Sequence, residues 1–281
     1  NQCLYYVYTM TLQQLVIKEQ IVKTVVKSGN GGAVWVPKDW LGEEVVIILP
    51  EKHKRSLQEQ IFHMLQPHLK DILSLSLYGS YARNEATKDS DIDVLVITKE
   101  KHFTIVDPDG KIEFLVLPLH KMKEAIEKYP ALYYQIIQEA EPLINSSLIE
   151  ELRKIPLHKK RFLAYLKETK EHILSNKEFV ELDKLDGAYI TSFSVLYSLL
   201  LRLRAVFIIK CILSQDSFSN KKFKKWIEEK GMSHKEFELC YEVYREVRDD
   251  RKIMHLEIKI STVEKIVVIL EKEVKKLEEK L

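Results

Sequence analysis

Two aspartates stand one residue apart in Ser90-Asp91-Ile92-Asp93, directly before the apolar run VLVI. Side chains alternate along a strand, so Asp91 and Asp93 are expected on the same face. Two carboxylates this close repel each other unless a cation lies between them, and partial burial increases the cost. Ligands that are all oxygen favour a hard divalent cation, Mg²⁺ or Mn²⁺. The spacing therefore predicts a metal site at the start of this strand.

A calcium-binding EF-hand loop is the alternative explanation for the same acidic residues. Asp89, Asp91, Asp93 and Glu100 occupy positions 1, 3, 5 and 12 of such a loop. The sixth position turns sharply and needs Gly, but Val94 stands there. The residues that follow are strand-formers, and no flanking helix is evident. The pattern excludes an EF-hand.

Upstream, the stretch LYGSYAR leads a short apolar strand into a Gly-Ser turn and the first turn of a helix. Gly79-Ser80 offers backbone N–H groups, a hydroxyl and the positive end of a helix dipole, all suited to phosphate. Arg83 can add a charge-assisted contact to the same phosphates. Taken alone, Gly79-Ser80 fits an ordinary Ser-capped helix equally well. The combination with the two aspartates is far more specific.

Together, GSYAR and SDID match the pattern GSxARGxxxxxSDIDLxV, so residues 77–97 resemble the minimal nucleotidyltransferases of the DNA polymerase β-like superfamily. A looser similarity covers residues 57–117. Asn84 stands where the family usually has Gly, and Asn tolerates the left-handed backbone better than most residues. The family needs a third carboxylate on a neighbouring strand. Glu113, in KIEFLVL, is the candidate, although the family more often has Asp there.

This resemblance implies an enzyme that moves an NMP from an NTP to a hydroxyl acceptor and releases pyrophosphate. ATP is the favoured triphosphate, and the acceptor is a protein, an RNA or a small molecule. Asp91 and Asp93 would hold Mg²⁺ or Mn²⁺ on the triphosphate. Glu113 would complete a second metal site or take the proton of the acceptor hydroxyl. The nucleotide-binding residues implied by the motif are Gly79, Ser80, Arg83 and Ser90.

The first segment, residues 1–51, has the spacing of a small β unit. We expect strands at Glu19–Lys27, Ala33–Pro37 and Glu44–Leu49, separated by the turn clusters SGNGG and KDWLG. The run VVKSGNGGAVWVPKDWLGEEVVIIL resembles AbrB-like swapped-hairpin modules, in particular the short kind attached to archaeal transposon-associated proteins. That resemblance implies an obligate homodimer, and a unit this small cannot bury a core alone.

DNA binding is the weaker expectation for this module. Lys23, Lys27 and Lys38 could contact phosphate, but Glu43 and Glu44 oppose them.

The last segment, residues 147–281, has almost no Gly or Pro and predicts roughly four or five helices, ending in Val263–Leu281. We expect a helical bundle that binds the acceptor. In RDDRKIMH, Arg248 and His255 fit the loose Arg-x(4–6)-His spacing of HEPN ribonucleases, in which His acts as acid or base on RNA. These are two common residue types with two aspartates between them, so a bundle His beside a salt bridge is the favoured reading.

Composition narrows the class of protein. With 281 residues, 46% of them hydrophobic, the chain is long enough for two or three globular parts, and a net charge of +2 does not indicate a nucleic-acid binder. Its three cysteines (Cys3, Cys211 and Cys240) lack disulfide or zinc spacing and indicate a reducing compartment. The N-terminus does not resemble a signal peptide, so we expect a cytoplasmic protein, with Met10 a candidate natural start.

The most apolar run, Val195–Leu213, is nearly long enough to cross a bilayer but is interrupted by Arg202, Arg204 and Lys210. We therefore expect a buried bundle helix and no membrane partner.

These observations predict an α+β fold in three parts. Residues 1–51 would form the β dimerisation module, residues 52–146 a nucleotidyltransferase domain with a mixed sheet, and residues 147–281 an all-α bundle. The competing function is a non-catalytic regulator, antitoxin-like or DNA-binding, that retains this fold without transfer.

Overall fold

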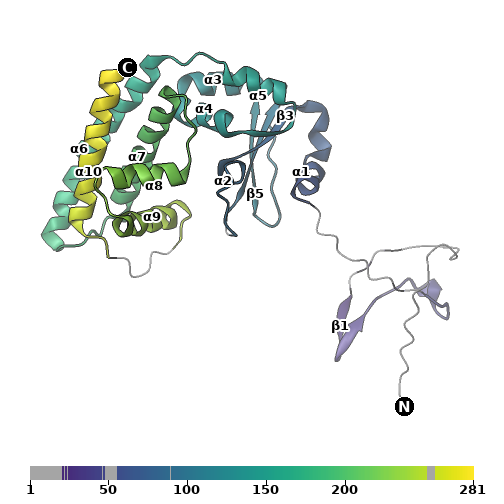
Figure 1. The fold of residues 1–281 in the computed structure, drawn as a ribbon. Helices are drawn as coiled ribbons and strands as arrows, with labels where there is room; N and C mark the ends of the chain where they lie inside the picture. Colours follow the sequence, from purple (N-terminus) through teal and green to yellow (C-terminus); the bar gives the residue numbers. More distant parts are fainter. Residues whose placement is uncertain are drawn as a thin grey trace. The chain divides into compact units, whose positions relative to one another are not determined.

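The computed structural model describes residues 21, 23, 25–45, 47, 56–88, 90–251 and 257–281. The chain divides into two compact units, Asn1–Lys54 and Arg55–Leu281. Short N-terminal strands, a central mixed sheet and a C-terminal helical region give the predicted α+β fold (Figure 1). Cys3 and Met10 lie outside the described residues, whereas Cys211 and Cys240 are free and buried.

The first unit contains one small hairpin. Strands β1 (Val26–Ser28) and β2 (Gly31–Ala33) pair antiparallel across a two-residue turn, where Gly29 has a φ of +57°. The predicted turn is confirmed, but the strands are shorter than expected. Residues 34–37 are not in a strand, and neither are the described residues of the expected third strand. A strand persists only where its N–H and C=O groups find partners, and β1 offers three paired residues.

Large apolar side chains of this unit remain exposed to solvent. A short 3₁₀ helix, Lys38–Trp40, follows the hairpin. Trp35, Leu41 and Ile47 are 75%, 76% and 72% exposed. Side chains of this type stabilise a fold only when they are removed from water. The described residues of this unit therefore do not bury a core of their own.

The second unit is built on a four-stranded sheet in the order β5-β4-β3-β6. Its strands are β3 (Ile72–Tyr78), β4 (Ile92–Thr98), β5 (Ile112–Pro118) and β6 (Glu141–Ile144). The first three coincide with the expected strands before Gly79-Ser80, at VLVI and at KIEFLVL, because each is a run of apolar and β-branched residues bounded by turns. Strand β3 pairs antiparallel with both of its neighbours, β4 and β6.

Strands β4 and β5 are parallel, with Ile92 opposite Ile112 and Ile97 opposite Leu117. The connection between them is short, as in a hairpin, but the two strands run in the same direction. Parallel strands require the chain to return to the same end of the sheet, which takes a crossover of about a dozen residues. Residues 99–111 make this crossover without a helix.

Helices cover both faces of the sheet (Figure 1). Helix α1 (Leu57–Leu65) begins with a Ser56–Glu59 capping box and packs Ile61 and Leu65 on one face, against Val94 and Val96. The opposite face, which carries Leu95 and Ile97, contacts three helices. These are α3 (Leu119–Lys128), α4 (Pro130–Glu139) and α5 (Ser146–Arg153). Strand alternation therefore directs odd-numbered residues of β4 towards α3, α4 and α5.

The C-terminal region is helical, as predicted, and has its own hydrophobic core. Helix α7 (Phe193–Leu213) is the expected buried helix, with Leu196, Leu199 and Leu203 fully shielded. The other members are α6 (Lys159–Asp186), α8 (Asn220–Glu229), α9 (His234–Arg248) and α10 (Ile260–Lys280). Within the described residues, no helix is both long and apolar enough to cross a bilayer.

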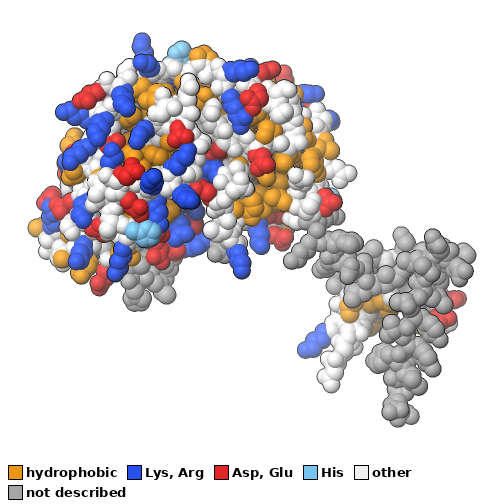
Figure 2. Space-filling view, in the orientation of Figure 1, with side chains coloured by type: hydrophobic (Ala, Val, Ile, Leu, Met, Phe, Trp, Pro, Cys, Tyr) orange, Lys and Arg blue, Asp and Glu red, His pale blue; other side chains and the backbone are white. Residues whose placement is uncertain are grey.

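Charged side chains of both signs are interspersed over the helical region on the face that Figure 2 shows. Basic residues do not gather there into a patch of one sign, as they do on many nucleic-acid-binding surfaces. This agrees with the small net charge of the chain.

Candidate active site

Gly79 makes the turn that ends β3, and its backbone admits no other residue without strain. Its φ is +71°, and a Cβ atom on it would overlap Asp93 Oδ2 and lie 2.9 Å from Asp93 Cγ. The absence of a side chain lets the Asp93 carboxylate lie directly against the turn. The four-residue helix α2 (Gly79–Ala82) follows, and Asn84 has the left-handed φ of +55° expected of it.

The sheet register brings the predicted carboxylates together. Tyr78 is opposite Asp93 across β3 and β4, and Asp93 is opposite Glu113 across β4 and β5. Residues opposite each other in a sheet point to the same face, so these three side chains form a row. Asp91 lies two residues before Asp93 and is exposed, as is Glu113, whereas Asp93 is partly buried.

Within this row, burial and the neighbouring negative charges act together on the Asp93 carboxyl. Burial raises the pKa of its carboxyl to about 6, and the negative charges of Glu113, Glu139 and Asp91 add to the rise, opposed by Arg83. Burial, followed by the charges of Asp93 and Glu113, also raises the pKa of the Tyr78 hydroxyl, which therefore stays protonated. Asp93 thus occupies a site with an excess of negative charge.

In the part of the chain that the structure describes, no three His, Cys, Asp or Glu side chains converge as ligands around one point. The backbone nevertheless places Asp93 and Glu113 side by side. Asp91 is exposed and directly precedes β4. This donor set consists of oxygen alone, which is the chemistry of a Mg²⁺ or Mn²⁺ site. The residues fit such a cation in type and backbone position, and their side chains must turn inward to bind it.

Glu139, at the end of α4, is the residue of this site that sequence reasoning missed. Its carboxylate accepts hydrogen bonds from Gly79 N–H (2.9 Å), Arg83 Nη1 (2.6 Å) and Gln135 Nε2 (3.0 Å). Two of the donors expected to bind phosphate are therefore engaged by a carboxylate of the chain. Glu139 is distant in sequence from the motif and belongs to no spacing pattern that would have identified it.

The other predicted nucleotide-binding residues lie on the turn after β3 and in the loop before β4. The Ser80 hydroxyl has no hydrogen bond to any described residue and is partly exposed. Ser90 lies near the end of the loop that leads into β4, where its Oγ accepts a hydrogen bond from Thr87 N–H at 2.9 Å. Arg83 Nε donates to Glu85 Oε2 at 3.0 Å. Ser80 is thus the member of this set whose side chain is free to bind a ligand.

The alternative ribonuclease pair is described only in part. Arg248 lies at the end of α9 and forms a salt bridge with the adjacent Asp249 at 2.6 Å. His255 lies outside the described residues.

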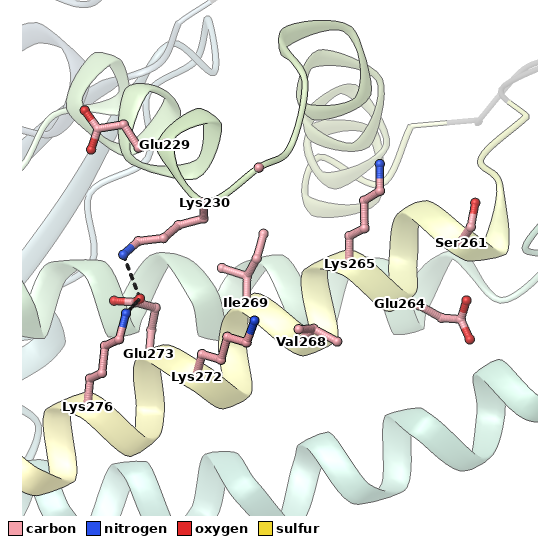
Figure 3. A pocket seen from close by; sticks show the side chains of 11 residues that line it. Glu229, Lys230, Ser261, Glu264, Lys265, Val268, Ile269, Lys272, Glu273 and Lys276 are labelled. Atoms are coloured by element: carbon pink, nitrogen blue, oxygen red, sulfur yellow. Dashed lines mark hydrogen bonds and ion pairs between the residues drawn. The ribbon is translucent and has the colours of Figure 1, made fainter.

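A cavity of about 620 Å³ lies in the helical region, where α10 faces the link between α8 and α9 (Figure 3). None of the predicted site residues lines it. Its buried carboxylate, Glu273, is already neutralised by Lys230 (2.8 Å) and Lys276 (2.9 Å). The buried acid of this cavity is therefore paired, and no predicted site residue lies there, so the carboxylate row of the sheet is the better candidate.

Comparison with known proteins agrees with this choice. A family model described as nucleotidyltransferase domain matches residues 57–181. This part of the chain is therefore similar to nucleotidyltransferase domains. The match begins at the first residue of α1, includes the site from Gly79 to Glu113 and also Glu139, and ends within α6. Nucleotidyl transfer in general is therefore the activity associated with this part of the chain.

The chain was also compared with curated proteins and with solved structures. No protein among the curated sequences matches the chain. Among solved structures, the crystal structure of a nucleotidyltransferase-like protein from Exiguobacterium sibiricum covers 77% of this chain and 75% of its own, with 10% sequence identity and a TM-score of 0.36.

Proposed function

We propose that this chain transfers an NMP from an NTP, with ATP favoured, to a hydroxyl acceptor and releases pyrophosphate. The observation that carries the proposal is the placement of Asp93. It lies against the Gly79 turn and directly beside Glu113 in the sheet. A turn that can bind phosphate beside two neighbouring carboxylates is the minimum arrangement for metal-assisted phosphoryl chemistry.

Asp91, Asp93 and Glu113 would hold Mg²⁺ or Mn²⁺. When bound, the cation would neutralise the triphosphate and stabilise the attacking and leaving oxygens of an in-line displacement at the α-phosphate. Asp93 must lose its proton to act as a ligand, and its pKa of about 6 leaves it ionised at neutral pH. Glu113, exposed at the edge of this group, can also accept the proton of the acceptor hydroxyl.

Ser80 would donate its hydroxyl to the β- or γ-phosphate. Its position at the first turn after β3, with a free side chain, supports this role. Ser90 would act indirectly, by holding the loop that leads into Asp91. The helical region would bind the acceptor, because its core is independent of the sheet and its helices contact α4 of the site.

The N-terminal unit would hold two chains together. Its exposed Trp35, Leu41 and Ile47 support this, because a second copy can bury them. DNA binding by the same unit is the weaker proposal and depends on lysines such as Lys27 and Lys38.

A thermal-shift experiment tests the binding half of the proposal. Purified protein is melted with ATP alone, Mg²⁺ alone and both together, and the same is done for Asp91→Asn. The proposal predicts a stabilisation that needs both ligands in the wild type and is lost in the variant. Equal stabilisation of both proteins by Mg²⁺ and ATP would place the nucleotide elsewhere.

A further inference from the structure

Arg83 lies between two carboxylates that come from different parts of the unit. Nε donates to Glu85 at 3.0 Å, and Nη1 donates to Glu139 at 2.6 Å. The three side chains are largely buried, with exposed fractions of 11% for Arg83, 17% for Glu85 and 9% for Glu139. A planar guanidinium can bridge two carboxylates in fixed directions, which a flexible lysine cannot do.

Both carboxylates of this bridge also accept hydrogen bonds from backbone N–H groups. Glu139 accepts from Gly79 N–H, so one end holds the turn of the candidate site. Glu85 accepts from Asn220 N–H (3.1 Å) and Lys221 N–H (3.2 Å), the first two amides of α8 in the helical region. Amides at a helix start have no partner within the helix, and a carboxylate there also interacts favourably with the helix dipole.

The contacts continue into the helical core. Phe218 is buried just before α8. The centroid of its ring lies 5.4 Å from Arg83 Cζ and 5.0 Å from Arg204 Cζ. Tyr241 OH on α9 donates to Asn220 Oδ1 at 3.2 Å. The pKa of Glu85 shows the balance at this junction. Burial alone raises it, but the hydrogen bonds from Arg83, Asn220 and Lys221 outweigh burial and lower it.

A triphosphate is a poor replacement for Glu139 on Arg83. Displacing Glu139 would leave a buried carboxylate without the guanidinium that lies 2.6 Å from it. Breaking a buried ion pair and leaving one partner uncompensated is strongly destabilising. The Gln135 amide, itself buried, adds a third donor that keeps Glu139 in place.

We propose that Glu139, Arg83 and Glu85 form a positioning relay that fixes the Gly79-Ser80 turn to the N-terminus of α8, so that the helical region controls NTP binding. This inference rests on the proposed function, because the turn is taken to bind the triphosphate. In this account Arg83 orients the turn and does not itself contact phosphate. Anything that moves the start of α8, such as an acceptor bound to the helices, alters the turn.

The test compares Glu85→Gln with Glu228→Gln, a matched control on α8 whose carboxylate pairs with His234 on the surface. Steady-state transfer from labelled NTP gives KM and kcat. The relay predicts that Glu85→Gln raises KM for NTP about tenfold or more while kcat falls less, and that the control stays within twofold. Arg83→Lys should behave like Glu85→Gln, because lysine cannot bridge both carboxylates. An unchanged or lowered KM in Glu85→Gln, as expected if freeing Arg83 improves its grip on phosphate, would overturn the relay.

Amide hydrogen exchange separates failure of the relay from failure of the proposed function, because it needs no activity. In Glu85→Gln, exchange should quicken at Asn220 and Lys221 and also at Gly79 and Ser80. Faster exchange confined to α8 would overturn the relay even if the protein proves to be an active transferase. Faster exchange at both places in a protein without transfer would retain the relay and reject the enzyme.

Discussion

Asp93 and Glu113 are direct neighbours across the parallel strands β4 and β5. Their backbones lie in register, and the Asp93 carboxylate also lies against Gly79, where a Cβ atom would overlap Asp93 Oδ2. Because Asp91 is two residues before Asp93 on the same strand face, three acids separated by up to 22 positions in sequence share one end of the sheet.

Replacing Asp93 by Asn should stabilise the metal-free protein at high pH. The folded-state pKa is raised from 3.8 to about 6, so this carboxyl contributes its full stability below the unfolded value and loses it as pH rises through about 6. In EDTA at pH 8 we expect a gain of about 1 kcal/mol after allowance for solvent screening, or about 2–4 °C in Tm. At pH 4 the gain should vanish.

Differential scanning calorimetry at the two pH values measures this gain, and Asp109→Asn, in an exposed turn, serves as the control. A metal-free Asp93→Asn protein that melts below the wild type at pH 8 would contradict the electrostatic description of the site.

Gly79→Ala should cost more stability than Gly110→Ala, although both glycines have similar positive φ values of +71° and +65°. A Cβ atom at Gly110 meets nothing within 4 Å, so its substitution measures backbone strain alone, about 1–2 kcal/mol. At Gly79 the methyl group also displaces Asp93. Urea denaturation of both variants, with Mg²⁺-dependent ATP binding as a second measurement, gives the comparison. Equal stability and equal binding in the two variants would show that the contact with Asp93 is unimportant.

Glu113→Gln should abolish transfer with little effect on folding. Glu113 is exposed, so removing its charge leaves no buried group unpaired, whereas a metal ligand or base is lost. We expect a fall in kcat/KM of at least about 100-fold and a change in Tm near zero. Glu141→Gln, on an exposed edge position of the same sheet, should keep full activity. Glu113→Asp should retain measurable transfer, since the carboxylate is preserved. Activity of Glu113→Gln equal to that of Glu141→Gln would exclude the assigned role.

Trp35→Glu should convert the protein from dimer to monomer. Trp35 is 75% exposed within one chain, and a charge there opposes burial in an apolar interface. Light scattering after size exclusion measures the mass, and Lys27→Ala, an exposed substitution on β1, should leave it unchanged. A wild-type mass equal to one chain would refute the dimer, whereas loss of DNA binding in Lys27→Ala would favour the regulator.

Local patterns predicted most of the sheet and the carboxylate row. The spacing of Asp91 and Asp93 encodes strand alternation, and Asn84 takes the left-handed conformation that its type allows. Glu139 escaped prediction because its bond to Gly79 joins residues 60 positions apart, and Glu85 meets α8 across 135 positions. Such contacts depend on how helices pack and leave no local spacing signal. The N-terminal strands are shorter than expected because a strand needs hydrogen-bond partners for its N–H and C=O groups. Strands β1 and β2 supply such partners to each other over three residues only.

The most direct test of the central claim is incubation of the protein with each of the four α-labelled NTPs and Mg²⁺ or Mn²⁺, alongside its Asp91→Asn/Asp93→Asn variant. We predict that label appears in the protein, or in an added cell extract, only with the wild type and only with metal present. Absence of label in every combination, although the wild type still binds NTP, would contradict the account and identify the chain as a nucleotide-binding regulator.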